Sequence, residues 1–463
     1  MIYRKKNQKI ASRQKSFLCI FDNFSNRKIY EICVNIPLNH QILSVTILTI
    51  CQMLLHKAES YAAPCGTDPL PENRDTLFCE EEKCMRKMMC VALTGAVTAG
   101  LAMSSMAAEV IKIGGIGPTT GPAAIYGSNV QNAMEIAVEE VNAEGGDIQF
   151  ELQFEDDQHD PETSVNAYNS LKDWGMQILG GTVTTNPCIA VGSEAVSDNM
   201  FMLTPSASSQ DVISIGDNVF QVCFTDPNQG LASADYISEM GLGSKIGIIY
   251  NSSDAYSTGI LNTFLAEAQE KNLEVVANEA FTDDNSTDLT TQVQACKDAG
   301  ADLIFLPIYY TPASQILKAA SDMGYEAKFF GVDGMDGILS VEGFDTSLAE
   351  GVMLLTPFVA TSTDDLTVAF VKAYQEKTGD IPNQFAADAY DVVRVLHKAC
   401  TEAGVTADMS ASDICEALKA VITSDGFSYD GLTGEGMTWD ASGAVSKAPR
   451  GMVIQDGVYQ PMD

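Results

Sequence analysis

Two loops rich in hydroxyl side chains each follow a short apolar run and precede a predicted helix. The first loop, 180–187, is GGTVTTNP and contains Thr184; the second, 203–209, is LTPSASS and contains Ser208. A helix start offers free backbone N–H groups and the positive end of the helix dipole, and nearby hydroxyl groups add further donors. This combination can bind a carboxylate group. Ordinary N-capping of the following helix is the alternative interpretation for each loop.

The second half of the chain places side chains of opposite sign after its own apolar runs. Tyr309 and Tyr310 follow one predicted strand, and Asp333 stands at the end of another. A carboxylate there can bind an ammonium group, and phenol rings beside it can cover an apolar side chain; a turn or capping role is the alternative for Asp333. Arg394 and Arg450 lie outside the strand-end loops, so a second ligand carboxylate would find no guanidinium partner there. The pattern predicts a zwitterion with an uncharged side chain, sensed by closure of a cleft.

Motifs for catalysis, cofactors and metals are weak in this sequence. The glycine-rich loop 115–121 has the wrong spacing for a dinucleotide, and no glycine loop continues into the Lys-Ser/Thr pair of a phosphate cradle. His159 and His397 lack a Cys or Glu at ligand spacing, and Gly-x-Ser-x-Gly does not occur. Residues 283–294 resemble a calcium loop only superficially, because the required Gly and the final Glu are missing. We expect no cofactor, no metal and no enzymatic activity; a secreted enzyme on a Rossmann-like scaffold is the remaining alternative.

The elements that must position these loops form two series of alternating strands and helices. The expected strands are 110–117, 150–154, 176–180, 200–203 and 219–224, then 245–250, 273–281, 302–307, 329–332 and 352–356. Ser128 is predicted to cap the first helix. Such alternation implies parallel sheets covered by helices on both faces, hence an α/β fold with two lobes. Helices at 365–378, 383–403 and 412–423 and an extended tail follow, so each lobe is expected to be discontinuous.

Composition limits the class of partner. The chain has 463 residues, 46% of them apolar, and a formal net charge of −35. Residues 109–463 carry 14 Lys and Arg against 53 Asp and Glu, so the acidity belongs to the predicted fold. A polyanion repels nucleic acid and anionic membrane surfaces, so we expect neither as a partner. The five widely spaced cysteines after residue 108 are predicted to be mostly buried apolar residues.

The N-terminal region differs from the rest. Residues 85–108 have the layout of a secretory signal peptide, with two basic residues, a short apolar stretch and small residues ending at Ala108. We expect a soluble extracytoplasmic product. Residues 1–84 show no fold-like period and are predicted to be a non-native or unstructured extension preceding a natural start at Met85. A membrane-anchoring segment at 42–55 is the alternative.

Several segments, in this order and spacing, carry a resemblance to a known family. They are IKIGGIGPTTGPAAIYGSNVQNAMEIAVEEVNAEGG, MLTPSAS, DPNQG, LPIYYTPASQILKAA, FFGVDG, AEGVMLLTP and TWDASG. Across essentially all of 109–463 the chain resembles the type I periplasmic solute-binding proteins, in particular the branched-chain amino-acid (Leu/Ile/Val) binding family of ABC importers. The resemblance implies two Rossmann-like lobes joined by three hinge linkers, with the ligand in the cleft between them. The expected lobes are 109–228 with 358–432, and 229–357 with 433–463.

The resemblance also implies roles for single residues. Thr184 matches a hydroxyl residue that contacts the ligand carboxylate, and Asp333 matches the acid that holds the α-ammonium group. Ala207 and Ser208 match a second loop that touches both ends of the ligand, and Tyr309 matches a cleft tyrosine. Four further residues match positions that line the side-chain pocket: Tyr126, Tyr256, Phe385 and Val183.

The expected function follows from this resemblance. A monomeric extracytoplasmic protein would bind a neutral, branched-chain amino acid and deliver it to the permease and ATPase subunits of an ABC importer. Asp333 stands where the family often has Glu, and Val183 replaces other residues of the family's pocket. Aromatic amino acids, small amides and urea-like solutes therefore stay open as ligands, and a ligand-sensing receptor of the same fold is the alternative function.

Overall fold

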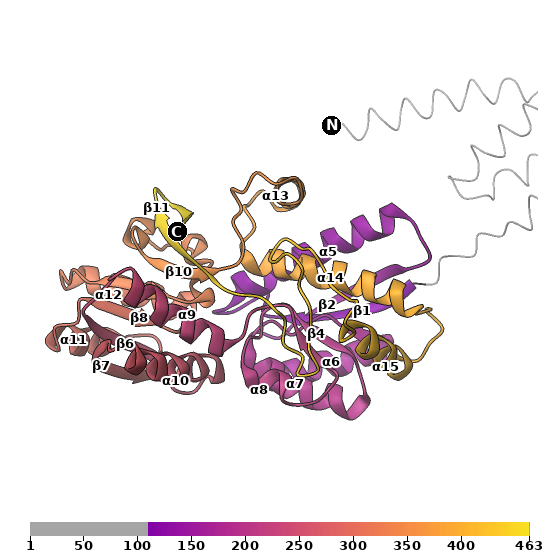
Figure 1. Cartoon of the computed structure of the whole chain (residues 1–463), viewed down its shortest axis with the longest axis horizontal. Helices are drawn as coiled ribbons and strands as arrows, with labels where there is room; N and C mark the ends of the chain where they lie inside the picture. The colour runs from indigo at the N-terminus through magenta and orange to yellow at the C-terminus, as the bar shows by residue number, and fades with distance from the viewer. Residues whose placement is uncertain (1–109, 463) are drawn as a thin grey trace, which may run out of the picture. The chain divides into compact units, whose positions relative to one another are not determined.

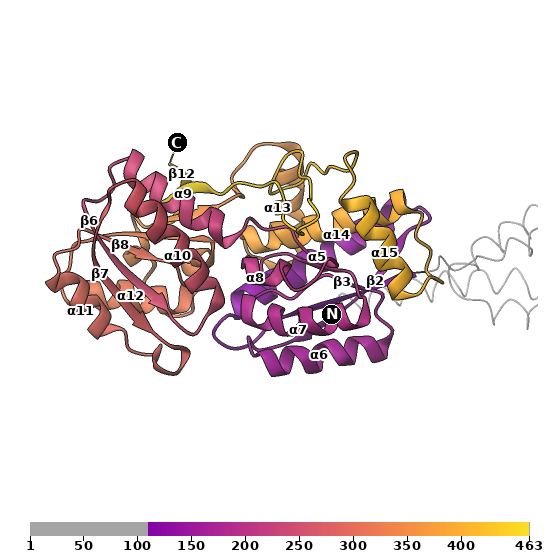
Figure 2. The same ribbon diagram turned by 60° about the horizontal axis from the view of Figure 1, so that its bottom comes forward.

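The structure, a computed structural model, describes residues 110–462, which form two β-sheets with helices packed on their faces (Figures 1 and 2). This arrangement confirms the predicted α/β fold with two lobes. The predictions for 1–84 and 85–108, including the signal peptide and the segment 42–55, lie outside the described residues. Within 110–462, no helix combines the length and hydropathy of a membrane span.

The first sheet has five parallel strands in the order β2-β1-β3-β4-β5. These strands are β1 (Val110–Gly117), β2 (Gln149–Asp156), β3 (Ile178–Leu179), β4 (Met202–Thr204) and β5 (Val219–Gln221). The intervening helices are α5 (Ala124–Glu144), α6 (Pro161–Trp174), α7 (Thr185–Asp198) and α8 (Gln210–Ile213). Figure 2 shows α6 and α7 on one side of the sheet and α5 on the other. Strand order reverses beside β1, and in such sheets ligands bind beyond the carboxyl ends of the strands at this point.

The second sheet has seven strands in the order β12-β11-β10-β9-β8-β6-β7. Its parallel strands are β6 (Lys245–Asn251), β7 (Glu274–Phe281), β8 (Leu303–Leu306), β9 (Lys328–Gly331) and β10 (Met353–Thr356). Two antiparallel strands, β11 (Arg450–Gln455) and β12 (Val458–Pro461), complete the sheet as a hairpin with its turn at 456–457. Its helices are α9 (Asp226–Glu239), α10 (Ala255–Glu270), α11 (Thr290–Asp298) and α12 (Tyr310–Asp322), with short 3₁₀ helices at Asp283–Asn285, Asp333–Met335, Ile338–Ser340 and Thr346–Ala349.

Helices cover both faces of this second sheet because its strand residues alternate between two cores. Leu303 and Phe305 of β8 pack with α9 and α10 in one cluster. Ile304 and Leu306 pack with α11 and α12 in another. Successive strand residues point to opposite faces, so a continuously apolar strand is the expected pattern for a sheet buried on both sides.

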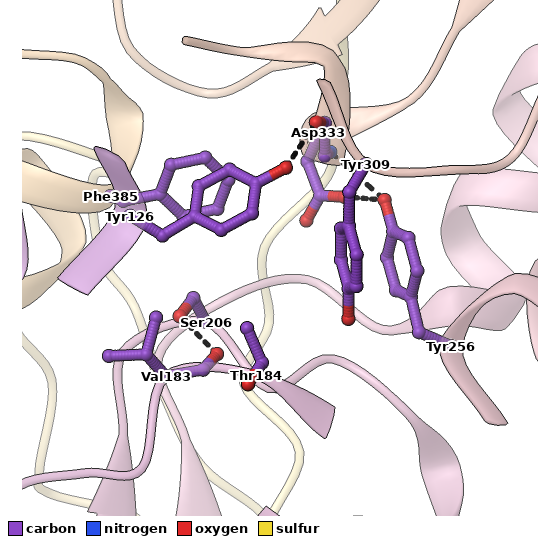
Figure 3. A pocket seen from close by; sticks show the side chains of 9 residues that line it. Tyr126, Val183, Thr184, Ser206, Tyr256, Tyr309, Asp333 and Phe385 are labelled. Carbon is purple, nitrogen blue, oxygen red and sulfur yellow. Dashed lines mark hydrogen bonds between the residues drawn. The ribbon is translucent and has the colours of Figure 1, made fainter. Parts of the chain in front are cut away.

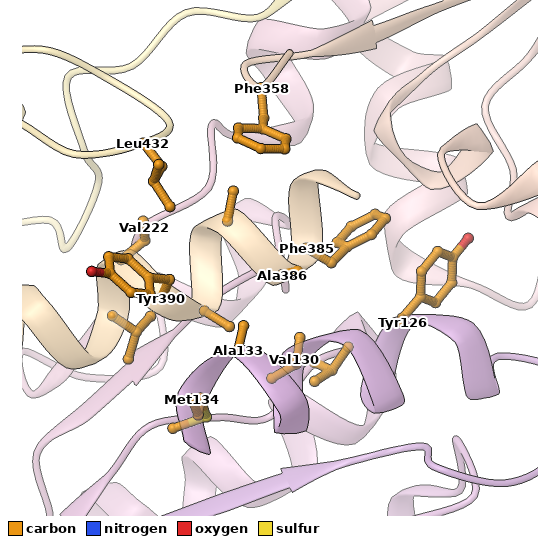
Figure 4. Close-up of a cluster of buried hydrophobic side chains, with 14 of the residues drawn as sticks. Tyr126, Val130, Ala133, Met134, Val222, Phe358, Phe385, Ala386, Tyr390 and Leu432 are labelled. Carbon is orange, nitrogen blue, oxygen red and sulfur yellow. The ribbon is translucent and has the colours of Figure 1, made fainter. Parts of the chain in front are cut away.

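Three further helices follow β10: α13 (Asp365–Thr378), α14 (Gln384–Ala403) and α15 (Ala411–Ile422). Helix α14 lies along α5, and side chains from both helices meet in one buried cluster (Figure 4). Helix α14 therefore extends the first lobe, whereas β11 returns to the second sheet. The chain passes between the two lobes three times: after β5, after β10 and before β11.

The segment between α15 and β11 packs on the first sheet over much of its length. The indole N–H of Trp439 donates to the carbonyl of Gln221 in β5 at 2.8 Å, and the amide of Gln221 donates to the carbonyl of Gly443 at 3.1 Å. Lys447 is buried, and its Nζ lies 2.6 Å from Oδ1 of Asp388 in α14. We propose that the last lobe boundary falls near residue 449 rather than at the predicted 432.

The first helix begins earlier than predicted. Ser128 lies inside α5, whose N-cap is Ala123 and has no capping side chain. Packing fixes this start instead: a Cβ on Gly127 would lie 2.1 Å from the carbonyl oxygen of Pro118, so only glycine lets the helix approach the preceding loop. The prediction followed the capping preference of serine, which tertiary packing overrides here.

The five cysteines of the described residues are Cys188, Cys223, Cys296, Cys400 and Cys415. All five are buried, as predicted, and none is paired with another among residues 110–462.

Candidate ligand-binding site

A pocket lies between the carboxyl ends of the two sheets (Figure 3). Its lining comes from seven strand-end loops or helix starts: Tyr126, Val183, Thr184, Ser206, Tyr256, Tyr309, Asp333, Gly334 and Phe385. We call Val183, Thr184 and Ser206 the first wall, and Tyr256, Tyr309, Asp333 and Gly334 the second wall. Tyr126 and Phe385 close one end.

The first wall is the start of helix α7 and the loop that follows β4. Thr184 is the N-cap of α7, yet its side chain makes no capping hydrogen bond. The amides of Thr185 and Asn186 in the first turn have no acceptor among the described residues. Ser206 Oγ donates to the carbonyl of Val183 at 2.7 Å, which fixes the two loops together. The first wall thus combines free amides, a hydroxyl and a positive helix end, as an anion site requires.

The second wall centres on a buried carboxylate. Asp333 follows β9 and is only 3% exposed. The hydroxyl of Tyr256 donates to Asp333 Oδ1 at 2.5 Å, while the amide of Gly334 donates to that same hydroxyl at 2.9 Å. A Cβ on Gly334 would lie 2.6 Å from the Tyr256 oxygen, so glycine is needed for this contact. Figure 3 shows the Asp333 carboxylate directed toward the space between the two walls.

Burial dominates the electrostatics of this wall. It raises the pKa of the Asp333 carboxyl to about 7, although the hydrogen bond from Tyr256 opposes the rise. Burial also raises the pKa of Asp254 to about 7 and that of Asp226 well above its ordinary value. Neither carboxylate oxygen of Asp226 has a hydrogen-bond partner among the described residues. A cation entering the second wall would favour the charged form of the Asp333 carboxyl.

Stacked phenols cover the space beside this carboxylate. The rings of Tyr256 and Tyr309 stack with centroids 4.7 Å apart and an interplanar angle of 11°. Tyr126 packs edge-on against Phe385 at 4.6 Å and against Tyr309 at 5.5 Å. These rings, with Val183, give the pocket an apolar end beside its two polar walls.

Hydrogen bonds join the lobes around the pocket, so the structure shows the closed form. The hydroxyl of Tyr126 donates to the carbonyl of Gly334 at 2.5 Å and accepts from the amide of Tyr310 at 3.2 Å. On another edge, the Asn186 side chain donates to the carbonyl of Ser253 at 3.2 Å. Most lining residues are between 1% and 7% exposed, and Tyr309 is partly exposed. We therefore expect a ligand to leave when the lobes separate.

The described residues contain no group of three or more His, Cys, Asp or Glu side chains placed to hold a metal ion. Arg394 is paired with Glu144 at 2.6 Å, and Arg450 stands on β11, so neither guanidinium lines the pocket. The pocket therefore offers one cation-binding carboxylate and one set of anion-binding donors.

Residues 110–456 match the sequence pattern of a family described as periplasmic binding protein. The chain belongs to this family. The match includes every residue of the pocket and every strand of the two sheets except β12, so the site lies in the cleft between the lobes of a periplasmic binding protein.

Individual relatives agree with this assignment. The chain is 29% identical over 338 residues to a Leu/Ile/Val-binding protein of Rhizobium johnstonii, covering 72% of this chain and 89% of the relative. A branched-chain amino acid transporter substrate binding protein of Streptococcus pneumoniae, solved in complex with isoleucine, is 25% identical with a TM-score of 0.68, covering 76% and 98%. A solute binding protein of an ABC transporter from Rhodopseudomonas palustris, in complex with 3,4-dihydroxybenzoic acid, shares the fold at 19% identity with a TM-score of 0.67, covering 76% and 96%.

The structure brings together seven of the nine predicted ligand-binding residues. The pocket is lined by Tyr126, Val183, Thr184, Tyr256, Tyr309, Asp333 and Phe385. Each lies at the carboxyl end of a strand or at a helix start. The strand-end pattern indicates Thr184, Tyr309 and Asp333, and the family resemblance indicates the other four. Their roles toward a ligand stay predictions.

The other two predicted residues lie behind the first wall. The amide of Ala207 donates to Thr204 Oγ1 at 3.1 Å, and the hydroxyl of Ser208 accepts from Gln229 Nε2 at 3.5 Å. The pocket presents their neighbour Ser206 instead. The assignment of Ala207 and Ser208 to ligand binding stays a prediction, which this closed form does not directly support.

Three residues near the pocket were missed from the sequence. Ser206 and Gly334 are direct neighbours of predicted residues, so the motifs located the loops but not every contact. His159 was assigned no role from the sequence, because it has no Cys or Glu at metal-ligand spacing. Its ring lies 2.8 Å from Thr184 Oγ1 and packs against Tyr309 with centroids 5.6 Å apart. His159, Thr184 and Tyr309 are far apart in the sequence and come into contact only in the folded chain.

Proposed function

We propose that this chain is the extracytoplasmic substrate-binding protein of an ABC importer and that it binds a neutral, branched-chain amino acid. The ligand is held between the closed lobes and passed to a membrane permease that works with an ATPase. The protein acts as a monomer and performs no chemistry. The observation that carries this proposal is the opposition of Asp333 to the start of helix α7 across one buried pocket.

The two walls fit the two poles of an amino acid. The free amides of α7 and the Thr184 hydroxyl would bind the α-carboxylate, because they are donors at a positive helix end. Asp333 would bind the α-ammonium group, which also removes the cost of burying an isolated carboxylate. The side chain would lie against Tyr126, Val183 and Phe385, which line the apolar end.

Charge in the pocket narrows the ligand class. No guanidinium reaches the pocket, so a glutamate or aspartate side chain would enter without a partner. Hydroxylated aromatic acids, such as the ligand of the Rhodopseudomonas palustris protein, carry no ammonium group and would leave Asp333 unpaired. A branched aliphatic amino acid leaves no polar group of the ligand unmatched.

Calorimetric titration of the purified protein with single solutes tests this proposal. Leucine, isoleucine and valine should each bind and raise the melting temperature, because a ligand specific for the folded form stabilises it. Glutamate and 3,4-dihydroxybenzoate should bind at least about tenfold more weakly than the best of the three. Tight binding of the aromatic acid, of a small amide or of urea, with no binding of the aliphatic amino acids, would overturn the proposal.

A further inference from the structure

His159 stands in the loop between β2 and α6 and is held by its own backbone. Its φ angle is 65°, in the left-handed region, and its amide donates to Asp157 Oδ1 at 2.9 Å. This conformation directs the ring across the first lobe to Thr184, where Nδ1 lies 2.8 Å from Oγ1. The edge of the ring packs against Tyr309 at an angle of 86°. His159 is thus a contact between the two walls.

The hydroxyl of Thr184 has a single proton to donate. Because the side chain does not cap α7, the ring of His159 is its hydrogen-bond partner among the described residues. A neutral imidazole carries a proton on one nitrogen only. If Nδ1 accepts, the Thr184 proton points at the ring and only lone pairs face the pocket. If Nδ1 carries the proton and donates, the Thr184 proton is free to point elsewhere.

A ligand carboxylate accepts hydrogen bonds and cannot donate them, so only the second arrangement lets Thr184 bind one. We propose that His159 is a positioning residue: its Nδ1–H donates to Thr184 Oγ1 and so directs the threonine proton to the carboxylate of the ligand. This inference rests on the proposed function, which places a carboxylate at the first wall. Contact with Tyr309 couples the same ring to closure of the second wall.

Two substitutions of similar shape separate donation from acceptance at this position. His159→Asn keeps an N–H donor near the position of Nδ1, whereas His159→Asp offers only acceptors, and both residues tolerate a positive φ. We expect H159D to bind leucine at least about tenfold more weakly than H159N in calorimetric titration. Equal affinities of the two variants would overturn the proposal.

The charge that H159D adds could also weaken binding, so both variants are repeated on a Thr184→Val background. Valine keeps the shape of the side chain but removes the hydroxyl through which His159 is proposed to act. The difference between Asn and Asp should fall to less than about threefold there, because coupling between two residues vanishes when the shared partner is removed. A tenfold difference that persists without the hydroxyl would assign the effect to charge and overturn the proposal.

The tautomer of His159 can also be measured directly in the ligand-free wild-type protein, so this test does not depend on the stability of a variant. Two-dimensional ¹⁵N NMR of the histidine side chains near pH 8 should show the Nδ1–H tautomer for His159, identified by loss of its signals in H159N. The Nε2–H tautomer would overturn the inference. If wild-type protein binds none of leucine, isoleucine and valine, the proposed function fails. If these bind and the tautomer is Nε2–H, only the role of His159 fails.

Discussion

The two walls of the pocket hold charge by different means. The first wall has no charged side chain; its positive character comes from helix α7, whose first amides and N-cap hydroxyl are left without capping partners. The second wall concentrates its charge in one carboxylate, Asp333, fixed by the Tyr256 hydroxyl. A distributed site shares the binding energy among several donors, whereas a concentrated site depends on one group. Substitutions should therefore be tolerated better in the first wall than in the second.

The residues around the two walls also differ: acidic side chains lie near the second wall, and hydroxyl side chains lie near the first. Asp226 and Asp254 are further buried carboxyl groups of the second lobe, and burial raises the pKa of both, which favours their protonated forms. The free-energy cost of keeping the Asp333 carboxylate charged in this wall is lowest when a cation is bound beside it. The first wall is surrounded by serine and threonine side chains that bond to backbone carbonyls, such as Thr204 Oγ1 to the carbonyl of Thr182 at 2.5 Å. These hydrogen bonds fix the geometry of the first wall whether or not a charged ligand is bound, whereas the second wall holds a buried carboxylate that a cation stabilises.

Replacing Asp333 by Asn should have the largest effect on affinity. The shape is kept, but a charge-assisted hydrogen bond worth about 1.5–3 kcal/mol is lost, so leucine should bind about 10- to 100-fold more weakly in calorimetric titration. The matched ligand is 4-methylpentanoate, which lacks the amino group and should lose no affinity in the variant. Unchanged leucine affinity in D333N would remove Asp333 from the site.

Lowering the pH should weaken binding through the same residue. Because burial raises the pKa of Asp333 to about 7, the carboxyl becomes protonated below that pH and no longer attracts an ammonium group. Affinity for leucine should fall about tenfold between pH 8 and pH 6, because binding to the protonated carboxyl must displace a proton. The D333N variant should show a flat profile over this range. A slope that persists in D333N would assign the titration to another group near the pocket, Asp254 or His159.

Replacing Thr184 by Val tests the distributed wall and should cost less. One hydroxyl donor is lost while the free amides of α7 stay, so we expect affinity for leucine to fall about five- to tenfold. Thr185→Val is the matched control, because Thr185 is buried and adjacent but does not line the pocket, and it should stay within about twofold. A loss in T184V as large as that in D333N would show that the first wall is concentrated as well.

Much of this site was predictable, because the alternation of strands and helices in the sequence shows where each strand ends. Apolar runs that end in hydroxyl or acidic residues put Thr184 and Asp333 at the carboxyl edges of two parallel sheets, where binding sites occur. The strands and the exact span of α13 followed from periodicity, because buried faces impose it. The aromatic residues Tyr126 and Phe385 came from the family resemblance, since nothing in their local pattern distinguishes them from core residues.

The remaining features depend on contacts between residues distant in sequence. His159 meets Thr184 only because β1 lies between β2 and β3, which brings two strand-end loops together. The start of α5 depends on close packing of Gly127 against Pro118 rather than on a capping residue. Contacts of this kind produce no periodic pattern in a single sequence, so they were found only from the three-dimensional structure.

Replacing Tyr126 by Phe should have the smallest effect and bear on closure rather than on either wall. The ring stays in the pocket, but its hydroxyl no longer bridges the lobes to Gly334 and Tyr310. A neutral hydrogen bond is worth about 0.5–1.5 kcal/mol, so leucine should dissociate about threefold faster in stopped-flow measurements. Tyr374→Phe is the matched control, because its hydroxyl donates to Asn129 Oδ1 at 2.8 Å within the first lobe, and it should leave the dissociation rate unchanged. Because both walls keep their polar groups in Y126F, a slower association with an unchanged dissociation rate would show that this bond does not hold the cleft closed.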